Sequence, residues 1–115
     1  MGRMSRNLHT ELTKIVLQRM NVEFKNGFFW DNKTTGVWNE TRQAYMAGNT
    51  YRGPADVLGV VSPNGLHVEL ECKTGKGKQT EGQKAHQELI EAQGGYYRVI
   101  RGHDDIEAAI KELKV

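Results

Sequence analysis

The sequence is poor in the features that cross-link, anchor or extend a small chain. Its one cysteine, Cys72, excludes an intrachain disulfide and a zinc site built from cysteines, and it is expected to fill space in the core. No apolar run approaches the ~20 residues of a membrane span and no signal peptide is evident, so we expect a cytoplasmic protein without a membrane partner. With 115 residues, the chain (1–115) is expected to fold as a single domain.

An excess of one charge sign is also lacking, because 16 Lys and Arg stand against 14 Asp and Glu. Net charge therefore says little about partners, but the distribution of charge says more. Acidic residues dominate 104–112, whereas basic residues gather in the termini and loops around the middle of the chain. A basic rim of this kind is compatible with binding a phosphate backbone. The basic residues placed to contact such a backbone, as in a DNA partner, are Arg6, Arg52, Lys76, Lys78 and Lys84.

The middle of the chain predicts a β-hairpin. Two apolar runs, 56–61 and 66–73, flank the turn sequence Ser-Pro-Asn-Gly, and both are short enough to be strands. The second run alternates strictly, so its residues are expected to face opposite sides of a sheet. One side would carry Leu66, Val68, Leu70 and Cys72, and the other His67, Glu69, Glu71 and Lys73.

The register of this hairpin decides which side chains meet. If Val61 pairs with Leu66, then Asp56 lies opposite Glu71, with Lys73 two residues along on the same face. Opposed carboxylates ~5 Å apart repel by roughly 3 kcal/mol at an effective dielectric of about 20, so the pair requires a cation or a proton. Two alternatives stay open. A turn at the Asn-Gly pair opposes Asp56 to Lys73 as an ion pair, and an odd-length loop turns Asp56 to the other face.

The segments before the hairpin predict a helix and strands. Leu8, Leu12, Ile15 and Val16 have the spacing of an amphipathic helix that runs to about residue 20, with Glu11 at the shoulder of its buried face. Residues 22–25 and 27–31 are predicted as strands, and 1–7 as an irregular start. Residues 32–50 are predicted only as a second strand or a short helix.

The segments after the hairpin predict helix, strand and helix. Thr80 and Gln83 form a capping box that opens the first helix, and Gly94 and Gly95 end it. Residues 96–100 are predicted as a strand, and Asp104 is predicted to cap the last helix. The whole order indicates an α/β fold with helices on a mixed sheet. The residues expected on the inner faces of the two helices are Ala85, His86, Leu89, Ile90 and Ala92, then Ile106, Ala109, Ile110 and Leu113.

An Asp on one strand followed by Glu-x-Lys on the next has a specific chemical use. Two carboxylates bind a hard divalent ion, Mg²⁺ or Mn²⁺, which keeps several waters and bridges to a phosphate oxygen. Lys73 on the same face can orient or deprotonate the attacking water and neutralise charge on the phosphate. Cys72 would contribute only its backbone carbonyl to the metal. By spacing alone the signal has moderate specificity, because Glu-x-Lys recurs on many exposed strand faces.

At these residues the chain resembles a known family. Gly53-Pro54-Ala55-Asp56 followed by Glu71-Cys72-Lys73 is similar to the PD-(D/E)xK nuclease superfamily, and more narrowly to the VRR-NUC (virus-type replication-repair nuclease) domain. The helix with Glu11, the segments 53–59, 71–74, 77–80 and Gln83, and the Gly-Gly pair follow in the family's order over nearly the whole chain. Cys72 stands where valine is common, and Ala55 where serine is often seen.

The resemblance implies a restriction-endonuclease-like αβββαβ core and roles for individual residues. Asp56 and Glu71 match the metal-binding acids, Lys73 the catalytic lysine, and Glu11 a helix acid that contacts the metal, often through water. Gln83 matches a glutamine that positions the lysine or the water, a role that can coexist with capping. The reaction implied is Mg²⁺- or Mn²⁺-dependent phosphodiester hydrolysis to 5′-phosphate and 3′-hydroxyl ends.

The substrate and assembly implied are branched DNA, such as Holliday junctions, and a homodimer, as for small stand-alone phage and bacterial members. Two other readings remain. One is a nucleic-acid-binding module without catalysis, in which the carboxylates pair with lysines. The other is a nicking, flap or restriction-type nuclease of the same fold. Glu69 is expected to form hydrogen bonds or a salt bridge at the margin of the site, and His67 to lie at its edge.

Overall fold

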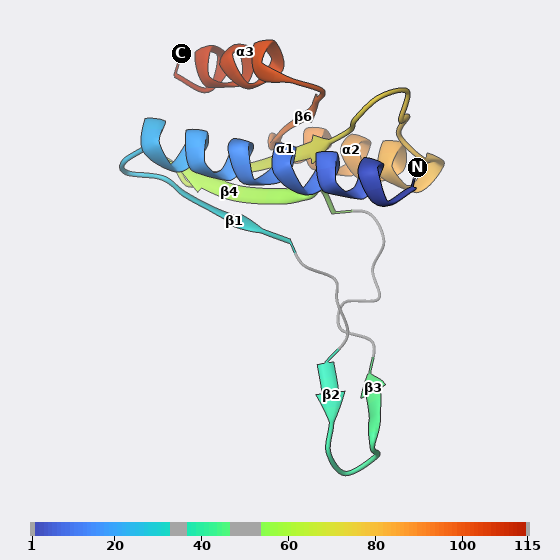
Figure 1. Ribbon diagram of the computed structural model, residues 1–115. Helices are drawn as coiled ribbons and strands as arrows, with labels where there is room; N and C mark the ends of the chain where they lie inside the picture. The colour runs from blue at the N-terminus through green and yellow to red at the C-terminus, as the bar shows by residue number, and fades with distance from the viewer. Residues whose placement is uncertain (1, 33–36, 47–53, 115) are drawn as a thin grey trace.

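A four-stranded mixed sheet with the strand order β1-β4-β5-β6 is the centre of the fold (Figure 1). The structure is a computed structural model that describes residues 2–32, 37–46 and 54–114, with the backbone alone for 2–7, 37–39 and 45–46. Antiparallel pairs join β1 (Phe28–Asp31) to β4 (Val57–Val61) and β4 to β5 (Leu66–Cys72), whereas β6 (Tyr96–Ile100) runs parallel to β5. The predicted α/β class with a mixed sheet flanked by helices is confirmed.

Two helices, α1 (Gly2–Glu23) and α3 (His103–Leu113), cover one face of the sheet. In Figure 1, α1 crosses in front of β4 and α3 lies above it, at the side of β6. The residues between these helices and the sheet are apolar, so the burial that drives folding is concentrated here. The core cluster comprises Val16, Met20, Phe29, Val57, Val61, Val68, Leu70, Cys72, Ile100, Ile106, Ala109 and Ile110.

The register of the β4–β5 hairpin is the one in which Val61 pairs with Leu66. The residues Ser62–Gly65 form the turn, so the pairing of Val57 with Leu70 places Asp56 next to Glu71 beyond the end of β4. Val68 and Leu70 are buried in the core, as the alternation predicts. The two alternatives, a turn at the Asn-Gly pair and an odd-length loop, are therefore wrong.

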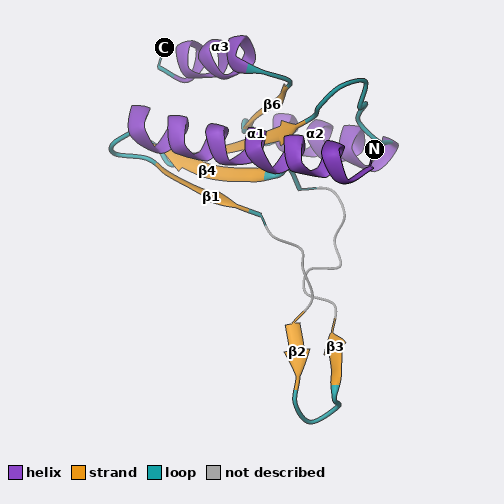
Figure 2. Cartoon of the chain, in the orientation of Figure 1, coloured by secondary structure: helices purple, strands orange, loops and turns teal. Residues whose placement is uncertain are grey.

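The remaining helix, α2 (Glu81–Ala92), packs against β6 on the opposite side of the sheet (Figure 2). The predicted capping box is present, with Thr80 accepting from the backbone N–H of Gln83 and the Gln83 side chain accepting from the backbone N–H of Thr80. The predicted buried side was largely wrong. His86 is the only buried residue of α2, and Leu89 is 58% exposed. The helix covers the sheet with polar side chains because it packs over the carboxylates of β5.

Several predicted boundaries also differ. Helix α1 begins at Gly2 and runs to Glu23, so the predicted irregular start and the predicted strand at 22–25 are wrong. The N-cap of α3 is Gly102 and not Asp104, and the backbone N–H of Arg101 donates to Asp105 instead (2.9 Å). Within 32–50, the described residues form a small antiparallel hairpin of β2 (Val37–Asn39) and β3 (Ala44–Met46), drawn apart from the main sheet in Figure 1.

In the part of the chain that the structure describes, every helix is too short or too polar to cross a membrane.

Candidate active site

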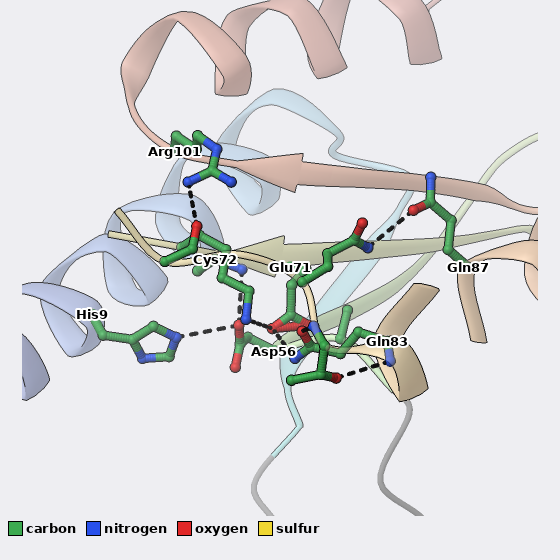
Figure 3. A network of polar contacts seen from close by, with 12 residues as sticks. His9, Asp56, Glu71, Cys72, Gln83, Gln87 and Arg101 are labelled. Carbon is green, nitrogen blue, oxygen red and sulfur yellow. Dashed lines mark hydrogen bonds and ion pairs between the residues drawn. The ribbon is translucent and has the colours of Figure 1, made fainter. Parts of the chain in front are cut away.

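Asp56 and Glu71 meet where the chain enters β4 and leaves β5. The backbone N–H of Cys72 donates to Oδ2 of Asp56 (2.8 Å), which ties this carboxylate to the strand that carries Glu71. Glu71 is only 4% exposed. This burial is costly for a carboxylate, because the group loses its hydration. Figure 3 shows both acids between α1, the sheet and α2. The structure thus brings together the two acids that the sequence predicted as metal ligands.

The environment of Glu71 favours a bound proton or a bound cation. Burial is the main cause that raises its pKa to about 9, and the charge of Asp56 and a side-chain hydrogen bond with Asp56 raise it further. Lys73 opposes this effect through its positive charge. The Oε2 atom of Glu71 is buried, and no group among the described residues donates a hydrogen bond to it. A buried carboxylate oxygen without a donor costs desolvation free energy, and a bound proton or metal ion would offset that cost at this atom.

Lys73 and Gln83 complete the polar environment of Glu71. The Nζ atom of Lys73 lies 4.0 Å from Oε1 of Glu71, and its side chain is 16% exposed. The Nε2 atom of Gln83 donates to the same Oε1 (3.1 Å), while its Oε1 accepts from the backbone N–H of Thr80 (2.9 Å). The Gln83 side chain therefore links the start of α2 to the acid pair. The predicted capping box coexists with this site contact, but the contact is with Glu71, whereas the resemblance implied Lys73 or the water.

The residue that α1 contributes to this region is His9 and not Glu11. The Nε2 atom of His9 lies 3.3 Å from Oδ2 of Asp56 (Figure 3). Glu11 is 65% exposed at its side chain and pairs with Lys14 (3.7 Å). Two residues turn a helix by about 200°, so a helix that buries Thr13 directs Glu11 outward. The prediction that Glu11 contacts the metal is not supported by this geometry.

The residues present fit a hard divalent cation. Among the described residues, no group of three or more His, Cys, Asp or Glu side chains is arranged to hold a metal ion. Mg²⁺, however, is commonly bound by one or two carboxylates, with water and substrate phosphate as the remaining ligands. The adjoining acids and the partnerless Oε2 of Glu71 match that requirement. Asp56 and Glu71 would hold such an ion, with the backbone carbonyl of Cys72 as a further donor.

The Cys72 side chain takes no part in this arrangement. It is 1% exposed in the core, and burial raises the pKa of its thiol to about 12. A thiol with so high a pKa is not ionised at neutral pH, so it neither binds metal nor acts as a nucleophile. The prediction that it fills space in the core is confirmed.

The basic residues beside the site are exposed where the structure describes them. Lys76 and Lys78 lie in the loop between β5 and α2, and Lys84 lies on α2 within 3.5 Å of Glu81. Arg101 holds the same loop, because its Nη1 donates to the backbone carbonyl of Gly77 (2.7 Å). Arg52 and the side chain of Arg6, also predicted to contact DNA, lie outside the described residues.

No family model matches the chain. No curated protein matches it either. The resemblance to the VRR-NUC domain therefore depends on the motif residues named above and on the arrangement in which they lie.

Glu69 is the second buried carboxylate of β5, and it lies next to the pair formed by Asp56 and Glu71. It is 2% exposed, and it accepts hydrogen bonds from the Ala55 backbone N–H (3.0 Å), from His86 Nε2 (2.8 Å) and from His67 Nε2 (2.6 Å). Burial alone would raise the pKa of Glu69, but these hydrogen bonds together lower it below its ordinary value. Glu69 is thus a charged, fully hydrogen-bonded side chain, and its predicted hydrogen bonds are present.

Three further residues, His9, His86 and Arg101, make contacts around the candidate site that the sequence did not predict. His9 continues the stripe of Thr13, Val16 and Met20 along α1, at spacings of four and three residues. That stripe could have been read from the sequence, but the apolar pattern that includes Leu8 and Ile15 obscured it. Leu8 is 56% exposed and Ile15 is 49% exposed, so the predicted face was rotated away from the true one.

Proposed function

We propose that the protein is a metal-dependent endonuclease that hydrolyses DNA phosphodiesters, as a VRR-NUC-type member of the PD-(D/E)xK superfamily. One observation carries the proposal: Asp56 adjoins Glu71, whose buried Oε2 has no hydrogen-bond partner among the described residues, and Nζ of Lys73, the residue directly after β5, lies 4.0 Å from Oε1 of Glu71. A binding module gains nothing from a pair of adjoining acids, whereas a metal-dependent hydrolase requires one.

The order of elements also supports the proposal. When the β2–β3 hairpin and the last helix, α3, are set aside, the chain runs helix, three strands, helix, strand, and only the last strand pair is parallel. This is the αβββαβ order that the resemblance implies. Asp56 directly precedes β4, and Glu71 lies on the neighbouring antiparallel strand β5, which supports the metal-binding roles that the resemblance implies for them.

Each residue has a role that follows from its position. Mg²⁺ or Mn²⁺, when bound, supplies Lewis-acid stabilisation of charge on the scissile phosphate. Asp56 and Glu71 bind the ion, and the amide of Gln83 holds the Glu71 carboxylate in place from α2. Lys73 orients the attacking water and neutralises charge that develops on the phosphate oxygens. Lys76, Lys78 and Lys84 contact the DNA backbone.

We further propose branched DNA as the substrate and a homodimer as the active form. Both follow from the resemblance to small stand-alone members of the family. A symmetric dimer of a small domain presents two equivalent sites, which suits a substrate with two equivalent strands to cut. The exposed lysines of the loop between β5 and α2 supply the charge for contacts with a phosphate backbone.

The proposal is tested with a labelled four-way junction and its linear duplex arms, each incubated with Mg²⁺, Mn²⁺ or EDTA. We expect cleavage that requires a divalent ion and is abolished in Lys73→Ala. The matched control is Lys111→Ala, which removes an exposed lysine of α3 remote from the acid pair and should cut like the wild type. Paired symmetric cuts confined to the junction would establish the branched substrate and the dimer.

Two results would contradict this function. If DNA is bound but not cut with any metal, and Asp56→Ala leaves or improves DNA affinity, the protein is a binding module. If the linear arms are cut as fast as the junction, the nuclease is of the nicking or restriction type, and the branched-DNA proposal is wrong.

A further inference from the structure

The segment that carries Asp56 into β4 is fixed by the residue that follows β1 and by side chains, beyond the last pairs of the sheet. Strand pairing between β4 and β5 begins at Val57, so the residues before it are beyond the ladder. Buried backbone groups there need other partners. Asn32 supplies two, because its backbone N–H donates to the carbonyl of Asp56 (2.8 Å) and its Nδ2 donates to the carbonyl of Ala55 (3.1 Å).

Glu69 supplies the partner on the other side. Its Oε1 accepts from the backbone N–H of Ala55, the residue directly before Asp56, and Ala55 is 0% exposed. The same Oε1 accepts from His86 Nε2, and the other oxygen, Oε2, accepts from His67 Nε2. His86 is 7% exposed and packs edge-on against Tyr97 on β6 (6.4 Å between ring centroids). The Glu69 carboxylate is therefore held in one position by α2 and β5 together.

This arrangement is more than is needed to satisfy one amide. A buried charge is costly unless it is fully hydrogen-bonded, and an apolar residue at this position would avoid that cost. Its one backbone contact is at the residue next to a proposed metal ligand. Removal of a group that orients a metal ligand from behind typically lowers metal affinity or activity by roughly 10–100-fold.

We propose that Glu69 is a positioning residue for Asp56. Together with Asn32 it clamps the Ala55–Asp56 backbone, and this sets the direction in which the Asp56 carboxylate meets Glu71. The proposal rests on the proposed metal-dependent function. It assigns Glu69 no contact with metal, water or DNA, because both of its oxygens are occupied within the protein.

Two substitutions of Glu69 separate the effect of side-chain length from the effect of charge. Glu69→Gln keeps the length of the side chain and the acceptor for the Ala55 amide, but removes the negative charge. Glu69→Asp keeps the charge and withdraws the acceptor by one methylene. We measure Mn²⁺ affinity by titration calorimetry, the cleavage rate at saturating DNA, and the thermal midpoint in EDTA. Glu88→Asp, an exposed position of α2, is the control for the same chemical change.

The expected result is that Glu69→Asp weakens Mn²⁺ binding by about tenfold. Its cleavage rate at saturating DNA should fall with it, while the KM for DNA stays unchanged. Glu69→Gln should stay within about threefold of the wild type in Mn²⁺ affinity, because it keeps the anchor. Asn32→Ala removes the other anchor of the same segment and should weaken Mn²⁺ binding in the same direction, which provides a test even if Glu69→Asp does not fold.

Several outcomes would overturn the inference. If Glu69→Asp lowers only the thermal midpoint and leaves Mn²⁺ affinity unchanged, Glu69 is a structural residue. If Glu69→Gln weakens binding as much as Glu69→Asp, charge and not position is decisive. If Glu69→Asp does not fold, unchanged Mn²⁺ binding in Asn32→Ala overturns the clamp. A wild-type protein that binds no Mn²⁺ and cuts no DNA removes the proposed function itself, which is a different result from a wild-type enzyme with an indifferent Glu69.

Discussion

Gln83 donates its side-chain amide to Glu71 across 3.1 Å while the carbonyl of the same amide caps α2. One side chain thus belongs both to the helix start and to the acid pair. The two functions can be separated, because a capping box accepts Glu as well as Gln at this position.

Gln83→Glu should keep the cap and disturb the site. The new carboxylate can still accept from the Thr80 amide, but it places a third negative charge beside the acid pair instead of a donor. We expect metal-dependent cleavage to fall by about tenfold or more. Thr80→Ala should do the opposite. It should lower the free energy of unfolding by about 1 kcal/mol and leave the cleavage rate unchanged at temperatures well below the thermal unfolding midpoint. Equal effects of both substitutions on cleavage would contradict this separation.

The raised pKa of Glu71 predicts a dependence of stability on pH in the absence of metal. The unfolded chain releases this proton near pH 4.5 and the folded chain near pH 9, so the folded state binds more protons between these values. The free energy of unfolding should therefore fall as pH rises through this window, by up to about 1.4 kcal/mol per pH unit. Glu71→Gln should remove this contribution and be the more stable protein at pH 8 in EDTA. Urea titrations from pH 5 to 9 measure it, and identical slopes for both proteins would contradict it.

Gly59 is expected to tolerate no side chain. A Cβ atom at this position would lie 2.2 Å from Cδ2 of Phe29 on the neighbouring strand, in a closely packed core. Gly59→Ala should therefore destabilise the protein by about 1–3 kcal/mol. Gly102→Ala is the comparison for an unobstructed Cβ, since nothing lies within 4 Å there, and its own cost should be limited to about 0.5–1 kcal/mol from an alanine at the N-cap of α3. Thermal unfolding compares the two, and a midpoint of Gly59→Ala equal to that of Gly102→Ala would show that Phe29 yields freely.

His9 and Glu11 should differ sharply although they are two residues apart. His9 contacts Asp56 at 3.3 Å, whereas Glu11 is exposed and pairs with Lys14. We expect His9→Ala to weaken Mn²⁺ binding by about tenfold and Glu11→Ala to leave it within about twofold of the wild type. Mn²⁺ titration of both variants makes the comparison. Loss of binding in Glu11→Ala would show that this acid reaches the metal and would contradict the prediction.

The central hairpin was predictable because turn and alternation agreed. The Ser-Pro-Asn-Gly turn and the strict alternation after Leu66 predicted the hairpin and included the observed register among three possibilities, and only that register brings Asp56 to Glu71. The capping box of α2 was equally local, so Thr80 and Gln83 could be placed without knowledge of the rest of the chain.

The faces of the helices were less predictable because they depend on tertiary packing. In α2 the apolar residue Leu89 is exposed and the polar residue His86 is buried, since the surface beneath this helix carries Glu69 and not a hydrophobic patch. Hydrophobic periodicity assumes an apolar partner surface, and that assumption fails over a polar site. The inward face of α1 was predicted wrongly for the same reason. The residues that continue its buried stripe, His9 and Thr13, are polar, and Glu11 lies outside that stripe.

Strand β5 is hydrogen-bonded along both of its edges, to β4 on one side and β6 on the other. It places Val68, Leu70 and Cys72 in the core and Glu69 and Glu71 on the opposite face. Amides of such central strands open to solvent exchange only when the whole domain unfolds. We therefore expect Glu71 to belong to the last cooperative unit to open, so a partly unfolded chain that retains β5 between its neighbours retains this acid on its strand as well.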